Sequence, residues 1–146
     1  MMTQIIAAFV GSIGFAIFFK MKGKQIPFAG LGGAVTWAVY LAVQTQFDGY
    51  FIPYLVASIF VALYAEFMAR INRAPAWIFL TSTAVPRIPG GSLYYAMAGL
   101  VNGDHELFTT SGEAAITIAL AISLGFVLEA ILARYYRMFI DRKTSN

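Results

Sequence analysis

The stretch PAWIFLTSTAVPRIPGGSLYYAM, residues 75–97, decides how this chain folds, because it is apolar at both ends and interrupted in the middle. Pro86 and Pro89 donate no backbone N–H and restrict the residue before them, so a helix stops here. Gly90 and Gly91 tolerate almost any backbone angle, so a helix can restart. About ten residues remain on each side, or roughly 15 Å of helix, which is half of a hydrocarbon core about 30 Å thick. We predict a membrane-spanning helix broken between Pro86 and Gly91, and broken helices at that depth usually line a path.

The composition of the whole chain indicates an integral membrane protein. Of its 146 residues, 60% are hydrophobic and 12% are charged, and the mean hydropathy is +0.73, which is far from the profile of a soluble domain. The absence of cysteine excludes disulfides, thiolate nucleophiles and cysteine metal ligands. We predict an all-α membrane protein with a single domain, residues 1–146.

Five apolar runs are candidates for membrane spans. We predict spans at about residues 2–19, 28–47, 50–69, 76–101 and 113–136, with a polar loop at 102–112. In the first span, Ala7, Gly11 and Gly14 lie on one face, which predicts a close approach of a neighbouring helix there.

Three of the spans carry polar or small residues at every fourth position, so these residues share one face of each helix. We expect these faces to point into a helix bundle. The three series are Gly32, Thr36, Tyr40 and Gln44; Tyr54, Ser58, Ala62 and Glu66; and Glu113, Thr117, Ala121, Gly125 and Glu129.

The basic residues predict the orientation in the membrane. Lysine and arginine crowd residues 20–24, residues 70–73 and the C-terminal tail, whereas the N-terminus and the segments around residues 48 and 102–112 have none. The positive-inside rule then gives an N-out, C-in topology. All three basic segments fall on one side only if the broken helix crosses completely, which requires five spans. Because all the basic residues except Arg87 sit beside span ends, we expect no nucleic-acid partner.

The chain resembles the small subunit, or C-terminal half, of the threonine/serine exporter family, over essentially its whole length. The motifs that carry the resemblance are Gly14-Phe15-Ala16 with Phe19, Pro75, Val85-Pro86-Arg87-Ile88-Pro89-Gly90 and Tyr95-Ala96-Met97. The resemblance implies a secondary transporter of the bacterial cytoplasmic (inner) membrane that exports small amino acids or short dicarboxylates. It also implies a larger partner subunit, which we expect to have the opposite topology. Arg87 stands where the family more usually has an apolar residue, which leaves the substrate open.

Residues at the break are the candidates for substrate binding. If Ser92 caps the second half-helix, the free amides of that helix face the midplane and favour an anion. Arg87 at mid-depth has to face protein or water, and we expect a carboxylate beside it, from the substrate or from the protein. A purely structural kink is the alternative. The candidates are Pro86, Arg87, Pro89, Gly90, Gly91, Ser92 and Tyr95.

Glu66 and Glu129 are candidates for proton coupling, because both lie at a similar depth near the predicted cytoplasmic end of their spans. The alternative is that they snorkel to the membrane surface or pair with Arg70, Arg134 or Lys20. The hydroxyl groups of residues 81–83 either line the path or bond back to carbonyls that Pro86 leaves without an N–H partner. We expect no metal and no cofactor, because His105, the one histidine, falls in the predicted loop at residues 102–112.

The leading function is therefore that of a transporter subunit, and the alternative is an accessory or assembly subunit that does not contact substrate. An enzyme is disfavoured, because the sequence offers no serine–histidine pair at membrane depth, no aspartate dyad and no histidine-rich metal site.

The predicted topology can be tested with single cysteines, because the chain has none of its own. In an N-out, C-in protein, Thr3→Cys and Asp104→Cys react with an impermeant thiol reagent outside intact cells, whereas Ser145→Cys does not. Reaction at position 145 without reaction at position 104 would contradict this topology.

Overall fold

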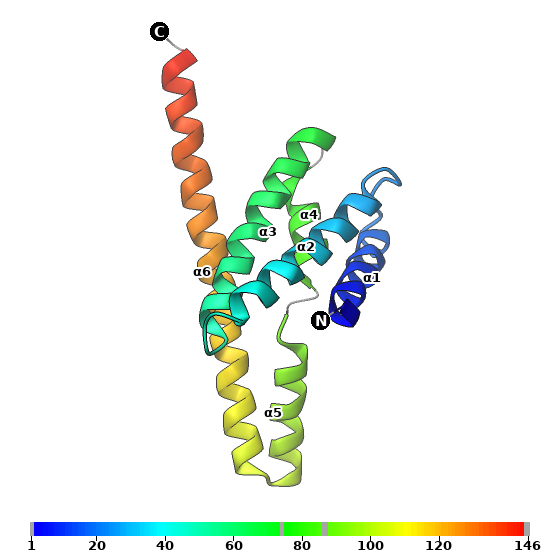
Figure 1. Cartoon of the computed structure of the whole chain (residues 1–146), viewed down its shortest axis with the longest axis vertical. Coiled ribbons are helices and arrows are strands. Elements are labelled where there is room, and N and C mark those ends of the chain that lie inside the picture. The colour runs from blue at the N-terminus through cyan, green and yellow to red at the C-terminus, as the bar shows by residue number, and fades with distance from the viewer. Residues whose placement is uncertain (1, 74, 86–87, 145–146) are drawn as a thin grey trace.

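The computed structural model describes residues 2–73, 75–85 and 88–144, with side chains as far as Tyr135. These residues form six α-helices and no strand (Figure 1). The helices are α1 (Met2–Phe18), α2 (Ile26–Gln44), α3 (Phe51–Asn72), α4 (Ala76–Ala84), α5 (Gly90–Asn102) and α6 (His105–Thr144). The all-α prediction is confirmed, and the first three predicted spans match α1, α2 and α3 within three residues.

The helices α2, α3 and α6 are each long and apolar enough to cross a membrane, α6 over residues 105–135. The first helix, α1, is apolar but has 17 residues. At 9 and 13 residues, α4 and α5 are each shorter than the roughly 20 residues that a crossing needs. Five crossings therefore require that α4 and α5 together make one, and this count stays a prediction.

A break separates α4 from α5, as the sequence predicts. α4 ends at Ala84 and α5 begins at Gly90, so the two predicted substrate residues Pro86 and Arg87 lie between them, outside the described residues. The prediction that Ser92 caps α5 is wrong. Pro89 is the residue before the helix, and its carbonyl already accepts the N–H of Leu93 at 3.0 Å, so Ser92 lies inside the first turn.

The predicted loop at residues 102–112 is also wrong, because α6 begins at His105. Gly103 ends α5 in the left-handed conformation (φ 71°), and the Asp104 carboxylate caps α6 by accepting the N–H of Leu107 at 3.0 Å. At Gly99 a Cβ atom would lie 2.6 Å from the backbone nitrogen of Phe108, so the two helices touch through their backbones. A tight helical hairpin replaces the loop.

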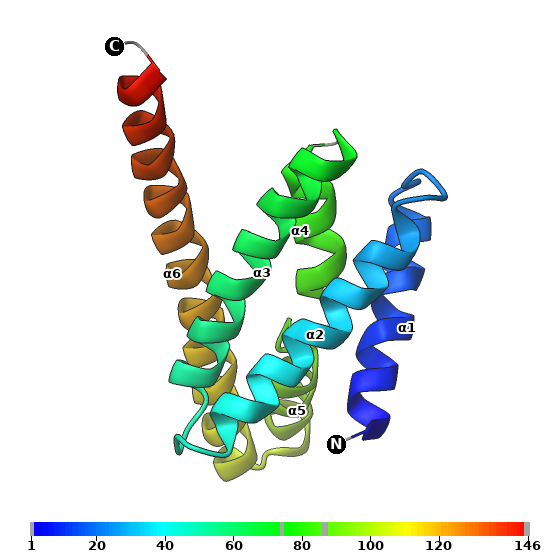
Figure 2. The ribbon, with the colours of Figure 1, turned by 45° about the horizontal axis from the view of Figure 1, so that its top comes forward.

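Consecutive helices pack together from α1 to α4 and again from α5 to α6, and α6 also lies beside α3. α1 packs on α2, α2 packs on α3, and α4 packs mainly on α3 with smaller contacts to α2 and α1. α5 packs against the first half of α6, and α6 then runs parallel to α3 and leans away from it toward the C-terminus (Figures 1 and 2).

The polar and small faces point into the bundle, as predicted. Ser58 on α3 donates to the carbonyl of Leu55 at 2.9 Å and to that of Ala121 on α6 at 3.5 Å. Tyr40 and Tyr54 pack ring against ring, with centroids 4.7 Å apart. The buried members of the three series are Gly32, Thr36, Tyr40, Tyr54, Ser58, Ala62, Ala121 and Gly125. Gln44 and Glu113, which are the last and first members of their series, are exposed.

In α1 the buried face differs from the predicted one. Ala8, Ser12 and Ala16 are buried, whereas a Cβ atom added at Gly14 would meet no atom within 4 Å. The two faces are one residue apart and both carry small side chains, so spacing alone cannot separate them. Contact with α2 decides which face is buried, because a Cβ atom at Gly33 would lie 2.7 Å from Cβ of Ser12.

The basic segments gather at one end of the bundle. The α1–α2 connection, the α3–α4 connection and the C-terminus lie at that end, while the N-terminus and the α2–α3 connection lie at the other (Figure 2). This is the arrangement that the predicted orientation requires, and the orientation itself remains a prediction.

The close contact of α3 with α6 predicts that Gly125→Ala destabilises the protein. A Cβ atom there would lie 2.8 Å from Cβ of Ser58 and 3.1 Å from the carbonyl oxygen of Leu55, so one helix has to shift. We expect a loss of about 1–3 kcal/mol in the free energy of unfolding in detergent. The control is Gly14→Ala, where the added methyl group meets open space, and equal losses for the two variants would contradict this packing.

Candidate functional site

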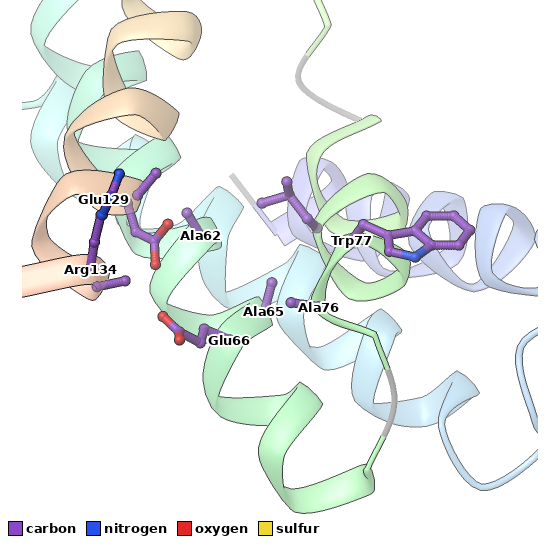
Figure 3. A pocket seen from close by; sticks show the side chains of 10 residues that line it. Ala62, Ala65, Glu66, Ala76, Trp77, Glu129 and Arg134 are labelled. Carbon is purple, nitrogen blue, oxygen red and sulfur yellow. The ribbon is translucent and has the colours of Figure 1, made fainter. Parts of the chain in front are cut away.

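The two predicted proton-coupling residues lie in one pocket (Figure 3). Glu66 comes from α3 and Glu129 from α6, and both carboxylates point into the space between these helices. The pocket has a volume of about 380 Å³, and α4 forms its third wall with Trp77 and Leu80. Five alanines and Arg134 complete the lining. The structure thus brings together residues that are 63 positions apart in the sequence.

The pocket exists because α3 and α6 touch in the lower part of Figure 1 and separate toward their C-terminal ends, in the upper part. At Ser58 and Gly125 the two helices are in close contact. On α3, Ala62 and then Glu66 follow Ser58 at intervals of four residues. On α6, Glu129 follows Gly125 at the same interval. The alanines around them are too short to fill the widening gap, so the carboxylates face a cavity rather than a packed core.

Glu66 forms an ion pair with Arg70 on its own helix, in which Nη2 of Arg70 donates to Oε1 of Glu66 at 2.9 Å. The predicted alternative of pairing with Arg70 is therefore confirmed for Glu66. The Glu66 side chain is 16% exposed and that of Arg70 is 55% exposed, so the cation lies outward of the anion. An exposed pair at i,i+4 contributes about 0.3–0.5 kcal/mol to stability, so this ion pair adds little to the stability of the fold.

A second and larger groove adjoins the pocket. Its volume is about 660 Å³, and it shares Glu66 and Ala133 with the pocket. Apolar side chains of α3 and α6 line most of it, with Arg70 one helical turn beyond Glu66. Glu66 therefore borders two spaces, one beside α4 and one beside the outer faces of α3 and α6.

The predicted substrate residues lie elsewhere, around the break, and none of the described ones lines the pocket of Glu66 and Glu129. Pro89 precedes α5, Ser92 is half-buried and Tyr95 is 56% exposed. At Gly90 and Gly91 an added Cβ atom would meet no atom within 4 Å. The start of α5 therefore has open space beside these two glycines.

The pocket and the break are nonetheless close along α4. Leu80 lines the pocket, and Ala84 ends the helix four residues later, which is about 6 Å of helical rise. The hydroxyl groups between them donate within α4: Thr81 to the carbonyl of Trp77, Ser82 to that of Ile78, and Thr83 to that of Phe79. These three donors bond back to their own helix, but to the carbonyls of residues 77–79 and not to the carbonyl of Ser82 that the missing N–H of Pro86 leaves free.

Trp77 is a lining residue that was not singled out from the sequence. Arg134, which the sequence offers as a possible partner of Glu66 or Glu129, lines the same pocket. The signal for Arg134 is its position five residues after Glu129, a little over one helical turn. Among the described residues, no group of three or more histidine, aspartate and glutamate side chains is placed to hold a metal ion, and His105 is exposed.

A family model described as "Threonine/Serine exporter, ThrE" matches residues 4–132 of the chain. The match covers most of α1, all of α2 to α5, and α6 as far as Leu132, so it includes Glu66 and Glu129, whereas the lining residues Ala133 and Arg134 lie just beyond it. No solved structure matches the chain.

The open pocket predicts a difference in reactivity between two alanines of α6. Ala133 lines the pocket, whereas Ala121 is fully buried against α3. We expect a charged thiosulfonate to modify Ala133→Cys at least about tenfold faster than Ala121→Cys in the folded protein, because a thiol has to ionise in water before it reacts. Equal rates in two folded variants would show that water does not reach the pocket.

Proposed function

The chain belongs to the threonine/serine exporter family, and on this basis we propose that it is one half of a transporter that exports threonine, serine or related small molecules. The observation that carries the proposal is the family match over residues 4–132. The family is one of membrane exporters, and the apolar helices are those of a multi-pass membrane protein. The substrates that we propose are small amino acids or short dicarboxylates, and the membrane is the bacterial cytoplasmic membrane.

The partner that we propose is a larger subunit of the same family with the opposite topology. Half-transporters with an odd number of spans combine in this way into inverted repeats. Support comes from the open surface at the start of α5, where Gly90 and Gly91 have space around them and Tyr94 and Tyr95 are 69% and 56% exposed. Backbone interrupted at membrane depth is tolerated where protein or water covers it, which a partner would provide.

Within this half, we assign the break to the substrate and the pocket to coupling. Pro86, Arg87, Pro89, Gly90, Gly91, Ser92 and Tyr95 remain the proposed substrate-binding residues. Glu66 and Glu129 are the proposed proton carriers, and their position in one pocket supports a joint role. Leu80 and Ala84, about one turn apart on α4, connect the two regions.

The test of this function is transport by purified protein in liposomes. The chain together with its candidate partner is expected to move labelled threonine or serine, and each chain alone is expected to move neither. If the partner transports at the full rate without this chain, the chain is an accessory subunit. If no amino acid and no dicarboxylate is moved by the pair, the proposed function is wrong.

Proton coupling predicts a specific effect of Glu129→Gln. In liposomes loaded with threonine, an outside-acidic pH gradient is expected to speed efflux by the unmodified transporter, because protons enter as threonine leaves. Glu129→Gln carries no titratable group and should lose this acceleration. The control is Glu113→Gln, which removes an exposed carboxylate from the same helix and should keep it. Equal acceleration in both variants would exclude Glu129 as a proton carrier.

A further inference from the structure

The charges of the pocket are those of a site for a small molecule that carries a positive group. Two carboxylates from different helices point into it, and Arg134 lines it as well. The Arg70 guanidinium is bound to Oε1 of Glu66 at 2.9 Å. A carboxylate has two oxygens and accepts up to about four hydrogen bonds, so it can bind an ammonium group alongside a guanidinium. The cavity between α3, α4 and α6 therefore presents carboxylate oxygens from two sides.

The size of the pocket fits a small ligand. Its volume of about 380 Å³ is near the lower end of the range of roughly 300–1,000 Å³ that is typical of small-molecule sites. The walls are short because alanines occupy positions 62, 65, 76, 130 and 133. A large substrate would not fit between these helices, and a single proton would not need the space.

Ligand chemistry follows from charge complementarity. An ammonium group has three N–H donors and pairs well with two carboxylates, whereas each carboxylate of a dicarboxylate would meet the like charges of Glu66 and Glu129. A zwitterionic amino acid presents one group of each sign, and the pocket presents two carboxylates and one guanidinium. The lining is therefore complementary to an amino acid and not to a dicarboxylate.

We propose that Glu66 and Glu129 bind the ammonium group of the transported molecule in this pocket, so that the protein selects zwitterionic amino acids over dicarboxylates. This inference rests on the proposed transport function and narrows its substrate class. It adds a contact on α3 and α6 to the substrate residues proposed at the break. Glu66 and Glu129 then hold either protons or an ammonium group, and the two occupants exclude each other.

The test compares threonine with 3-hydroxybutanoate, which is threonine without its ammonium group. Each is used to compete with labelled threonine for transport by the complete transporter in liposomes. We expect the unmodified protein to prefer threonine by about 100-fold or more, because a site built for a polar group strongly rejects an analogue that lacks it. Glu129→Gln should lower this preference at least tenfold, Glu129→Asp should retain most of it, and Glu113→Gln should leave it unchanged.

A second readout does not depend on a variant of either glutamate. Ala133→Cys places a thiol in the lining of the same pocket. Threonine is expected to slow modification of this thiol by a charged thiosulfonate at least threefold, and 3-hydroxybutanoate at the same concentration is expected to have no effect. Protection by both compounds, or by neither, would overturn the inference even if Glu129→Gln fails to assemble.

The outcomes separate the inference from the function on which it rests. If the transporter moves threonine, but Glu129→Gln and Glu66→Gln keep the preference of the unmodified protein, ammonium recognition at this pocket is wrong and the transport function stands. A variant Glu129→Gln that loses acceleration by a pH gradient but keeps the preference would make Glu129 a proton carrier alone. If neither threonine nor serine is moved at all, the proposed function and the inference fall together.

Discussion

The contact between α3 and α6 at Ser58, Ala121 and Gly125 is the constraint on which the candidate site depends. Ser58 donates to the carbonyl of Ala121, and glycine at 125 lets the backbones approach. In lipid, helices associate through such close packing, because apolar side chains gain little by leaving a solvent that is equally apolar. Since the two helices are held at this level and lean apart above it (Figure 1), the space between their upper halves becomes the pocket.

The short helix α4 links this pocket to the break. Trp77 and Leu80 form one wall of the pocket, and the same helix ends at Ala84, where the backbone loses its regular hydrogen bonds. The hydroxyls of Thr81, Ser82 and Thr83 donate to carbonyls of the same helix. Leu80 at the pocket and Ala84 at the break are about one turn apart. Both proposed sites are therefore connected through α4.

Packing, rather than residue type, explains where the sequence-based predictions failed. On α1 the faces of Ala7 and Ala8 are equally small, and Ser12 is buried because α2 offers Gly33 opposite it. Residues 102–112 are polar enough for a loop, yet the Asp104 cap and the close approach at Gly99 make them the end of a helical hairpin. Ser92 is not a cap because Pro89 and the two glycines already begin the helix.

By itself the sequence determined the all-helical membrane class, the presence of a break near residues 86–91 and the inward faces of three helices. These follow from local rules, since proline and glycine act on their own backbone and every fourth residue shares a helical face. Only the tertiary structure decided that Glu66 and Glu129 share a pocket with Arg134 and Trp77. That juxtaposition depends on the angle at which α6 leaves α3 and on the packing of α4 against α3, and the spacing of residues along a single helix determines neither.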